Sequence, residues 1–172
     1  VLHIKRVPDG QMSKYWFEEA KQDDLLRLKG PLGTFFLRDT QNKDLVFLAT
    51  GTGIAPITSI LGQMEKTGAF EKVKSVSVFW GGRTKSDIYF DPESISDAFS
   101  FTPVLSREDG DWHGARGYVQ DALLKNDLDL SNTCVYACGS KTMITDAKSQ
   151  LMKNGLSESQ FYSDAFVSSG ED

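Results

Sequence analysis

The chain has 172 residues, of which 40% are hydrophobic and 11% aromatic, so it can bury a substantial core in one or two domains and is not a disordered tail. Its formal net charge of −5 argues against nucleic acid or an anionic membrane surface as the main partner. No apolar run approaches the roughly 20 residues that cross a bilayer, so we expect no membrane span.

The sequence begins Val-Leu-His-Ile-Lys, without a methionine, and reads as the middle of a strand. We therefore expect the natural start to lie upstream. Whether a targeting segment was lost with it is left open.

The first forty residues show no alternation of strands and helices. Residues 1–7 and 24–30 read as strands, Ser13 to Ala20 as a short helix, and residues 30–37 as a turn into a third strand. This succession is typical of an antiparallel β domain, and forty residues are too few to close a barrel. We expect residues 1–40 to be part of a truncated β-barrel domain, with residues 38–44 as a polar linker.

Residues 41–172 alternate short apolar runs with amphipathic stretches. The apolar runs predict strands at residues 45–49, 76–80, 100–106, 134–138 and 160–166. Helical patterns or caps predict a helix after Gly53, one or two short turns within 85–99, a helix over 117–126, and a helix capped by Ser140 and closed by Gly155. The sequence therefore predicts an α/β fold, with a parallel sheet of five or six strands and helices on both faces.

Two glycines lie one residue apart between the first of these strands and its helix. Gly51 and Gly53 carry no side chain that would block a ligand, and the helix that follows directs unpaired N–H groups and its positive dipole end to the same place. A phosphate or pyrophosphate fits there. The alternative is a tight turn without a ligand, because Pro56 stands where the dinucleotide fingerprint has its third glycine.

Both cysteines fall in one predicted strand. Cys134 and Cys138 would then lie roughly 13 Å apart, whereas a disulfide needs α-carbons within about 7 Å. Since His3 and His113 are the only histidines, no zinc cluster can be assembled. We expect a reduced, cytoplasmic protein without a metal site.

Several motifs occur in an order that resembles a known family. The segments TGTGIAP (50–56), WGGRTKSDIYF (80–90), LSRED (105–109), YACGSKTMI (136–144) and YSDAF (162–166) resemble the pyridine-nucleotide domain of the ferredoxin–NADP reductase family. GQMSKYWF (10–17) and GPLGTF (30–35) resemble the end of that family's FAD-binding barrel. Within the family, the flavin reductases of the CDP-6-deoxyglucoseen reductase and oxygenase-reductase type are most similar.

The resemblance implies a flavin site. Gly10 and Ser13 match the motif that meets the FAD pyrophosphate, although Ser13 also reads as an ordinary helix cap. Asp164 and Phe166 match an acidic residue and an aromatic residue near the isoalloxazine. The family more usually has glutamate in place of Asp164, which leaves the role of this residue open.

The resemblance also implies a nicotinamide site. The residues Thr50, Gly51, Thr52 and Gly53 match the loop that receives the pyrophosphate of NADH or NADPH. Cys138, followed by Gly139, matches the cysteine that lies near the nicotinamide C4, where a small side chain leaves room for hydride to cross to the flavin. The alternative for Cys138 is a buried residue at the end of a strand.

The choice between NADH and NADPH is left open by the sequence. Gly81, Gly82 and Arg83 stand where an acidic residue would hold the ribose hydroxyls. By resemblance, Ser106, Arg107, Arg116 and Tyr118 form the set that grips a 2′-phosphate in NADPH users, and guanidinium groups suit that dianion. Surface ion pairing is the alternative for both arginines of this set, and the favoured one for Arg116.

The activity implied is hydride transfer from NAD(P)H to FAD and delivery of single electrons to an iron–sulfur domain or another electron-acceptor protein. The family's first flavin motif and the cysteines of a plant-type iron–sulfur cluster are missing, so we expect this chain to hold FAD weakly or not at all. The alternative is a non-catalytic nucleotide-binding or electron-transfer subunit that docks on a redox partner.

Overall fold

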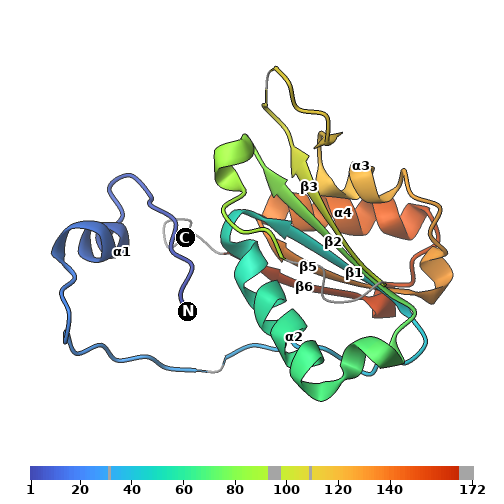
Figure 1. The fold of residues 1–172 in the computed structure, drawn as a ribbon, viewed down its shortest axis with the longest axis horizontal. Helices are drawn as coiled ribbons and strands as arrows, with labels where there is room; N and C mark the ends of the chain where they lie inside the picture. Colours follow the sequence, from blue (N-terminus) through green and yellow to red (C-terminus); the bar gives the residue numbers. More distant parts are fainter. Residues whose placement is uncertain (31, 93–97, 109, 167–172) are drawn as a thin grey trace. The chain divides into compact units, whose positions relative to one another are not determined.

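The computed structural model describes residues 1–30, 32–92, 98–108 and 110–166. The chain divides into two compact units, residues 1–34 and 35–172, which we describe one at a time (Figure 1).

The second unit is built on one six-stranded sheet in the order β4-β3-β2-β1-β5-β6. Its strands are β1 (Asp44–Thr50), β2 (Ser75–Gly82), β3 (Phe99–Leu105), β4 (Ala115–Arg116), β5 (Thr133–Gly139) and β6 (Phe161–Ala165). Every neighbouring pair is parallel. The predicted parallel sheet is confirmed, and the short strand β4 is the one that the sequence pattern did not indicate.

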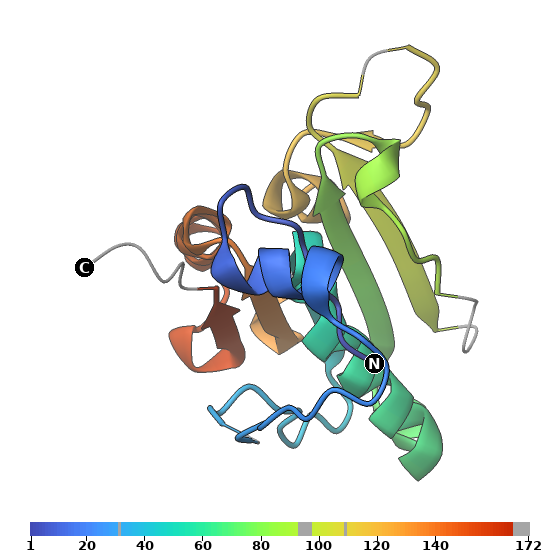
Figure 2. The ribbon, with the colours of Figure 1, turned by 90° about the vertical axis from the view of Figure 1, so that its left-hand side faces the viewer.

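Helices cover both faces of this sheet, as predicted. They are α2 (Ile54–Thr67), α3 (Val119–Leu123) and α4 (Lys141–Lys153), with short 3-10 turns η2 (Gly51–Gly53), η3 (Ala69–Lys72), η4 (Lys85–Asp87), η5 (Leu130–Asn132) and η6 (Glu158–Gln160). Seen from the side, α2 lies on one face and α4 on the other (Figure 2). Of the turns expected within 85–99, η4 is formed, and residues 93–97 lie outside the described residues.

Two caps set the ends of the long helices. The Ser140 hydroxyl accepts a hydrogen bond from the Met143 N–H at 3.3 Å, so α4 begins with the predicted cap. Gly68 ends α2 in the left-handed conformation, at φ 65°.

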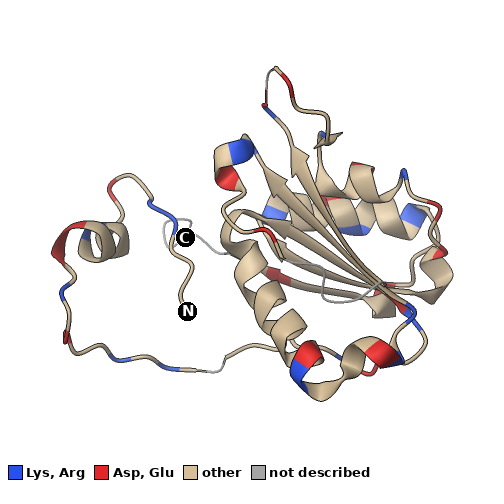
Figure 3. Cartoon of the chain, in the orientation of Figure 1, with Lys and Arg blue, Asp and Glu red and all other residues tan. Residues whose placement is uncertain are grey.

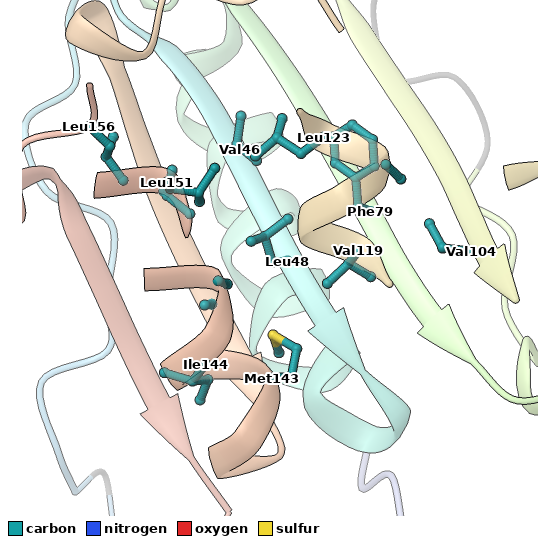
Figure 4. Close-up of a cluster of buried hydrophobic side chains, with 14 of the residues drawn as sticks. Val46, Leu48, Phe79, Val104, Val119, Leu123, Met143, Ile144, Leu151 and Leu156 are labelled. Atoms are coloured by element: carbon teal, nitrogen blue, oxygen red, sulfur yellow. The ribbon is translucent and has the colours of Figure 1, made fainter. Parts of the chain in front are cut away.

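Strand β1 is buried on both faces, which explains its continuous apolar sequence. Leu45, Phe47 and Ala49 pack in the cluster that includes the apolar face of α2. Val46 and Leu48 pack in the opposite cluster, with side chains from α3 and α4 (Figure 4). The sheet is thus the middle layer of three.

The first unit contains a short helix, α1 (Gln11–Lys14), continued by the π-helical turn η1 (Tyr15–Glu19). An ion pair joins Arg6 to Glu18 at 2.7 Å. The predicted helix is confirmed, with an earlier start.

The strands predicted at 1–7 and 24–30 and after the turn at 30–33 are wrong, because no strand is formed among the described residues before Asp44. Apolar residues such as Leu25 and Leu28 are fully or largely exposed. An extended segment becomes a strand only where a neighbouring strand pairs with its backbone, and none does here.

Charged side chains gather on helices and loops, with both signs interspersed, and the strands are almost free of them (Figure 3). Across the described residues, no helix is long and apolar enough to cross a membrane.

Candidate nucleotide-binding site

The order of the strands predicts where a ligand fits. From β1 the chain proceeds to β2 and β3 on one side, and β5 and β6 lie on the other side. The connections after β1 and β5 therefore leave the sheet in opposite directions, and in open parallel sheets ligands bind at such a reversal, outside the carboxyl ends of the strands.

The turn η2 joins β1 to α2 at this reversal. Gly51 has φ 53°, and a β-carbon built on it would meet nothing within 4 Å, so its outer side is open. Helix α2 has no side-chain cap at its N-terminus. The Ile54 N–H already donates to the Gly51 and Thr52 carbonyls of η2, so what this end of α2 presents to a ligand of negative charge is chiefly the positive end of the helix dipole.

Gly53 has a different role from the one predicted. A β-carbon on Gly53 would lie 2.1 Å from the carbonyl oxygen of Cys138. The absent side chain therefore makes room for β5, whereas the space beside Gly51 is open.

The ends of β1 and β5 are joined through Thr50. Its hydroxyl oxygen accepts a hydrogen bond from the Ser140 N–H at 3.1 Å. Gly139, at φ 145°, lies so close that a β-carbon on it would be 2.1 Å from the same oxygen. The two connections that flank the reversal are thereby held in fixed register.

Cys138 and Asp164 are directly opposed in the β5–β6 register. The Cys138 side chain is 0% exposed, and burial, together with the Asp164 charge, raises the pKa of its thiol to about 12. The thiol is therefore neutral at physiological pH. It lies in the buried cluster that includes the apolar face of α2, and a neutral buried thiol is a poor nucleophile.

Phe166 follows β6 at the same edge. Its N–H donates to the Gly139 carbonyl at 3.0 Å, and its side chain is 49% exposed. The structure thus brings Cys138, Gly139, Asp164 and Phe166 together around the ends of β5 and β6.

On the other side of the reversal, backbone hydrogen bonds join the residues that follow β2 and β3. The N–H of Ser106 donates to Gly82 at 3.0 Å, and that of Arg107 to Arg83 at 2.8 Å. The Ser106 hydroxyl also donates to the Gly82 carbonyl, at 3.3 Å. Among the described residues, the exposed guanidinium groups of Arg83 and Arg107 have no hydrogen-bond or ion-pair partner, so both remain available to an anion.

Arg116 and Tyr118 lie in and just after β4. The Arg116 guanidinium donates to three backbone carbonyls of the preceding loop, those of Glu108, Gly110 and Trp112. Within the described part of the chain it makes no ion pair. Tyr118 is 64% exposed and precedes α3.

Sequence reasoning did not find two tryptophans at this edge. The Trp80 indole N–H donates to the Gly51 carbonyl at 2.9 Å and so fixes the turn after β1. Trp112 lines an open cavity of about 660 Å³ with Lys85, Ile88, Tyr89, Phe90, Asp91, Phe101, Pro103 and Leu105. The sequence held a signal for Trp80, which ends the predicted strand 76–80, because a buried indole N–H needs an acceptor nearby.

The two residues predicted for FAD lie in the first unit. Ser13 is buried, and its hydroxyl oxygen accepts from the Val7 N–H at 2.8 Å. The Gly10 carbonyl accepts from the Lys14 N–H at 2.9 Å. Because the Ser13 oxygen is the acceptor, its hydrogen can still be donated to a phosphate oxygen.

Where the structure describes the chain, no group of three His, Cys, Asp or Glu side chains could hold a metal ion. The cysteines are both free and buried.

Comparisons with known proteins agree with this geometry. The chain is similar to the CDP-6-deoxy-L-threo-D-glycero-4-hexulose-3-dehydrase reductase of Yersinia pseudotuberculosis, at 39% identity over 98% of this chain and 51% of the relative. It is 30% identical to the anthranilate 1,2-dioxygenase electron transfer component of Acinetobacter baylyi, over 96% of this chain and 49% of that protein. The chain thus spans about half the length of the curated relatives it matches.

Among solved structures, the ferredoxin reductase in carbazole 1,9a-dioxygenase superposes with a TM-score of 0.76 at 25% identity, covering 95% of this chain and 50% of that one. Residues 1–37 match the model of the oxidoreductase FAD-binding domain. The model of the oxidoreductase NAD-binding domain matches residues 47–149. These matches confirm the resemblance predicted from the motifs: the chain belongs to the oxidoreductase family with this NAD-binding domain, of the ferredoxin–NADP reductase type.

Proposed function

We propose that this chain is the nucleotide-binding part of a flavin-dependent NAD(P)H reductase, with residues 41–172 as its NAD(P)-binding domain and residues 1–40 as the end of its FAD-binding domain. The observation that carries the proposal is the open side of Gly51 at the uncapped start of α2, placed where the strand order reverses. A dinucleotide pyrophosphate fits this place by charge and by space.

The coenzyme would extend in both directions from that turn. Toward β5 and β6, the nicotinamide would lie near Cys138, Gly139 and Phe166, where the thiol adds no charge of its own. Toward β2 and β3, the adenosine half would meet the exposed guanidinium groups of Arg83 and Arg107, for which the described part of the chain provides no partner. Thr50 and Thr52 flank the pyrophosphate.

FAD would be held in part by Gly10 and Ser13, whose hydroxyl hydrogen is left to donate. When bound, FAD supplies the acceptor of the hydride and the means to pass on single electrons. The chain's own part is to align the coenzyme, exclude water and keep the thiol at position 138 protonated.

The names of the relatives favour an electron-acceptor protein as the partner. One is a reductase of a dehydrase, and another is the electron transfer component of a dioxygenase. We propose an iron–sulfur protein or domain as the acceptor and the cytoplasm as the compartment.

Nucleotide binding is tested on this chain by titration with NADH and NADPH, followed by thermal unfolding. We expect one or both to raise the midpoint, because a ligand that binds only the folded state stabilises it. Reductase activity is tested on the natural protein that contains this sequence, as loss of flavin absorbance on anaerobic addition of NADH or NADPH.

Two results would contradict the proposal in different ways. If neither coenzyme shifted the midpoint, the nucleotide site would be wrong. If the coenzymes bound but left the flavin of the natural protein oxidised, the non-catalytic subunit would be the better account.

A further inference from the structure

The Arg116 side chain forms hydrogen bonds with the backbone of the loop that precedes it. Its guanidinium donates to the carbonyls of Glu108, Gly110 and Trp112, the two bonds from Nη2 being 3.1 Å each. The three carbonyl oxygens all accept hydrogen bonds from this one guanidinium, which therefore holds their backbone segments together.

The same loop is held at other points. The Glu108 carboxylate accepts from the Lys85 N–H at 2.7 Å, and the Trp112 indole donates to the Ala115 carbonyl at 2.9 Å. A β-carbon on Gly114 would lie 2.3 Å from the Trp112 ring, so the indole packs directly on the backbone. Arg116 contributes three of the hydrogen bonds that hold this loop, all from its charged guanidinium group.

The loop starts and ends at the nucleotide edge. Arg107 N–H bonds to the Arg83 carbonyl, and Gly117 N–H bonds to the Leu105 carbonyl at 3.0 Å. Arg107 is the first residue of this loop, so the contacts that hold Glu108 and residues 110–117 also bear on the direction of its side chain.

We infer that Arg116 is a positioning residue, which folds the loop that carries Arg107, and that it is not a ligand of a 2′-phosphate. Both Nη2 hydrogens and one Nη1 hydrogen are used by carbonyls, so a phosphate that approached the guanidinium would come close to these carbonyl oxygens. The negative ends of the carbonyl dipoles disfavour that approach. The guanidinium groups of Arg83 and Arg107 have no partner among the described residues, so these two cations remain available to bind a 2′-phosphate.

The test uses two probes that differ by one phosphate, adenosine 5′-monophosphate and adenosine 2′,5′-bisphosphate, titrated into the wild type and into Arg116→Ala, Arg116→Lys and Arg107→Ala. Hydrogen exchange of the Trp112 amide, whose N–H donates to the Gly110 carbonyl at 2.9 Å, is measured in parallel. The nucleotide readout rests on the proposed function, whereas the exchange readout does not.

For Arg116→Ala we expect exchange of the Trp112 amide to become about tenfold faster, because the hydrogen bonds from the guanidinium to the loop carbonyls are lost. The affinity for the bisphosphate should fall by more than that for the monophosphate, because the displaced Arg107 is the cation proposed to meet the additional phosphate. Arg116→Lys should not restore slow exchange, because a single ammonium lacks the planar fork of a guanidinium. Arg107→Ala is the control: it should weaken binding of the bisphosphate and leave exchange of the Trp112 amide unchanged.

The inference is overturned if Arg116→Ala loses about tenfold or more of its affinity for the bisphosphate alone while exchange stays slow. It is also overturned if Arg116→Lys binds the bisphosphate as the wild type does with the loop unchanged. If the wild type bound neither probe, the proposed function would fail, and exchange would still decide: faster in both Arg116 variants supports the inference, unchanged contradicts it.

Discussion

The carbonyl oxygen of Cys138 lies against Gly53, only 2.1 Å from where a β-carbon on that glycine would stand. The turn after β1 is therefore packed directly on the backbone of β5. These are the two strands between which the order of the sheet reverses, so one contact joins the turn proposed to hold the pyrophosphate to the strand that carries Cys138.

Gly53→Ala is expected to destabilise the fold by about 2 kcal/mol or more, because the obstructing atom is backbone and cannot rotate away. Urea unfolding measures the loss. Gly62→Ala is the matched control, because Gly62 lies in α2 with nothing within 4 Å of its β position and should stabilise by about 0.5–1 kcal/mol. Equal stability of the Gly53 variant and the wild type would show that β5 can move away.

The sequence predicted the parallel sheet because burial on both faces leaves a continuous apolar run, such as 45–49, that few other elements produce. The sequence also predicted the turn at Gly51 and Gly53, but it explained both glycines by the space that a ligand needs. The structure distinguishes them: Gly53 packs against the backbone of Cys138, whereas the space beside Gly51 is open.

The first forty residues were predicted less well because local pattern does not contain the pairing partner of a strand. Leu26 and Leu28 alternate with Arg27 and Lys29 as strand residues do, and both remain exposed without strand partners among the described residues. Arg116 shows the same limit at the site: the letters match a phosphate-binding set, but three carbonyls of its own loop engage the side chain, and those acceptors have no sequence signature.

Thr50→Val removes the acceptor of the Ser140 N–H and keeps the shape of the side chain. We expect a loss of about 1 kcal/mol in the free energy of unfolding, the usual net value of one hydrogen bond. Coenzyme affinity should also fall, because the ends of β1 and β5 lose the bond that holds their register. Calorimetric titration with NADH and NADPH measures the second effect.

Thr67→Val is the control for this change, because the Thr67 hydroxyl donates within α2 at its far end, to the Gln63 carbonyl at 2.8 Å. It should leave coenzyme affinity at the wild-type value. Should Thr50→Val bind both coenzymes as tightly as the wild type, the register of β1 and β5 would be irrelevant to the site.

The buried thiol predicts a fall in stability in alkaline solution. The pKa of Cys138 rises from 9.0 to about 12 on folding, because burial disfavours the thiolate. Between these values the unfolded chain has released the proton that the folded chain retains, so stability is fully present below pH 9 and is lost as the pH rises toward 12. The slope for this group approaches about 1.4 kcal/mol per pH unit.

Urea unfolding at about pH 8 and about pH 10 measures this slope. The phenol of Tyr136, whose pKa burial raises from 10.0 to about 12, adds to it at the alkaline end. Cys138→Ala should lower the slope between the two conditions. Equal stability of the wild type at both would mean that the thiol ionises within the folded protein.

Ser13→Ala tests the flavin assignment in the first unit. The Ser13 hydroxyl is the acceptor for the Val7 N–H, and its hydrogen is the group proposed to meet the FAD pyrophosphate. We expect about tenfold faster amide exchange at Val7 and weaker FAD binding by the natural protein, because one oxygen serves both purposes. Met12→Ala, at a neighbouring side chain that is 60% exposed, should change neither. Faster exchange at Val7 with unaltered FAD affinity would leave Ser13 as a structural residue of the turn before α1 and remove it from the flavin site.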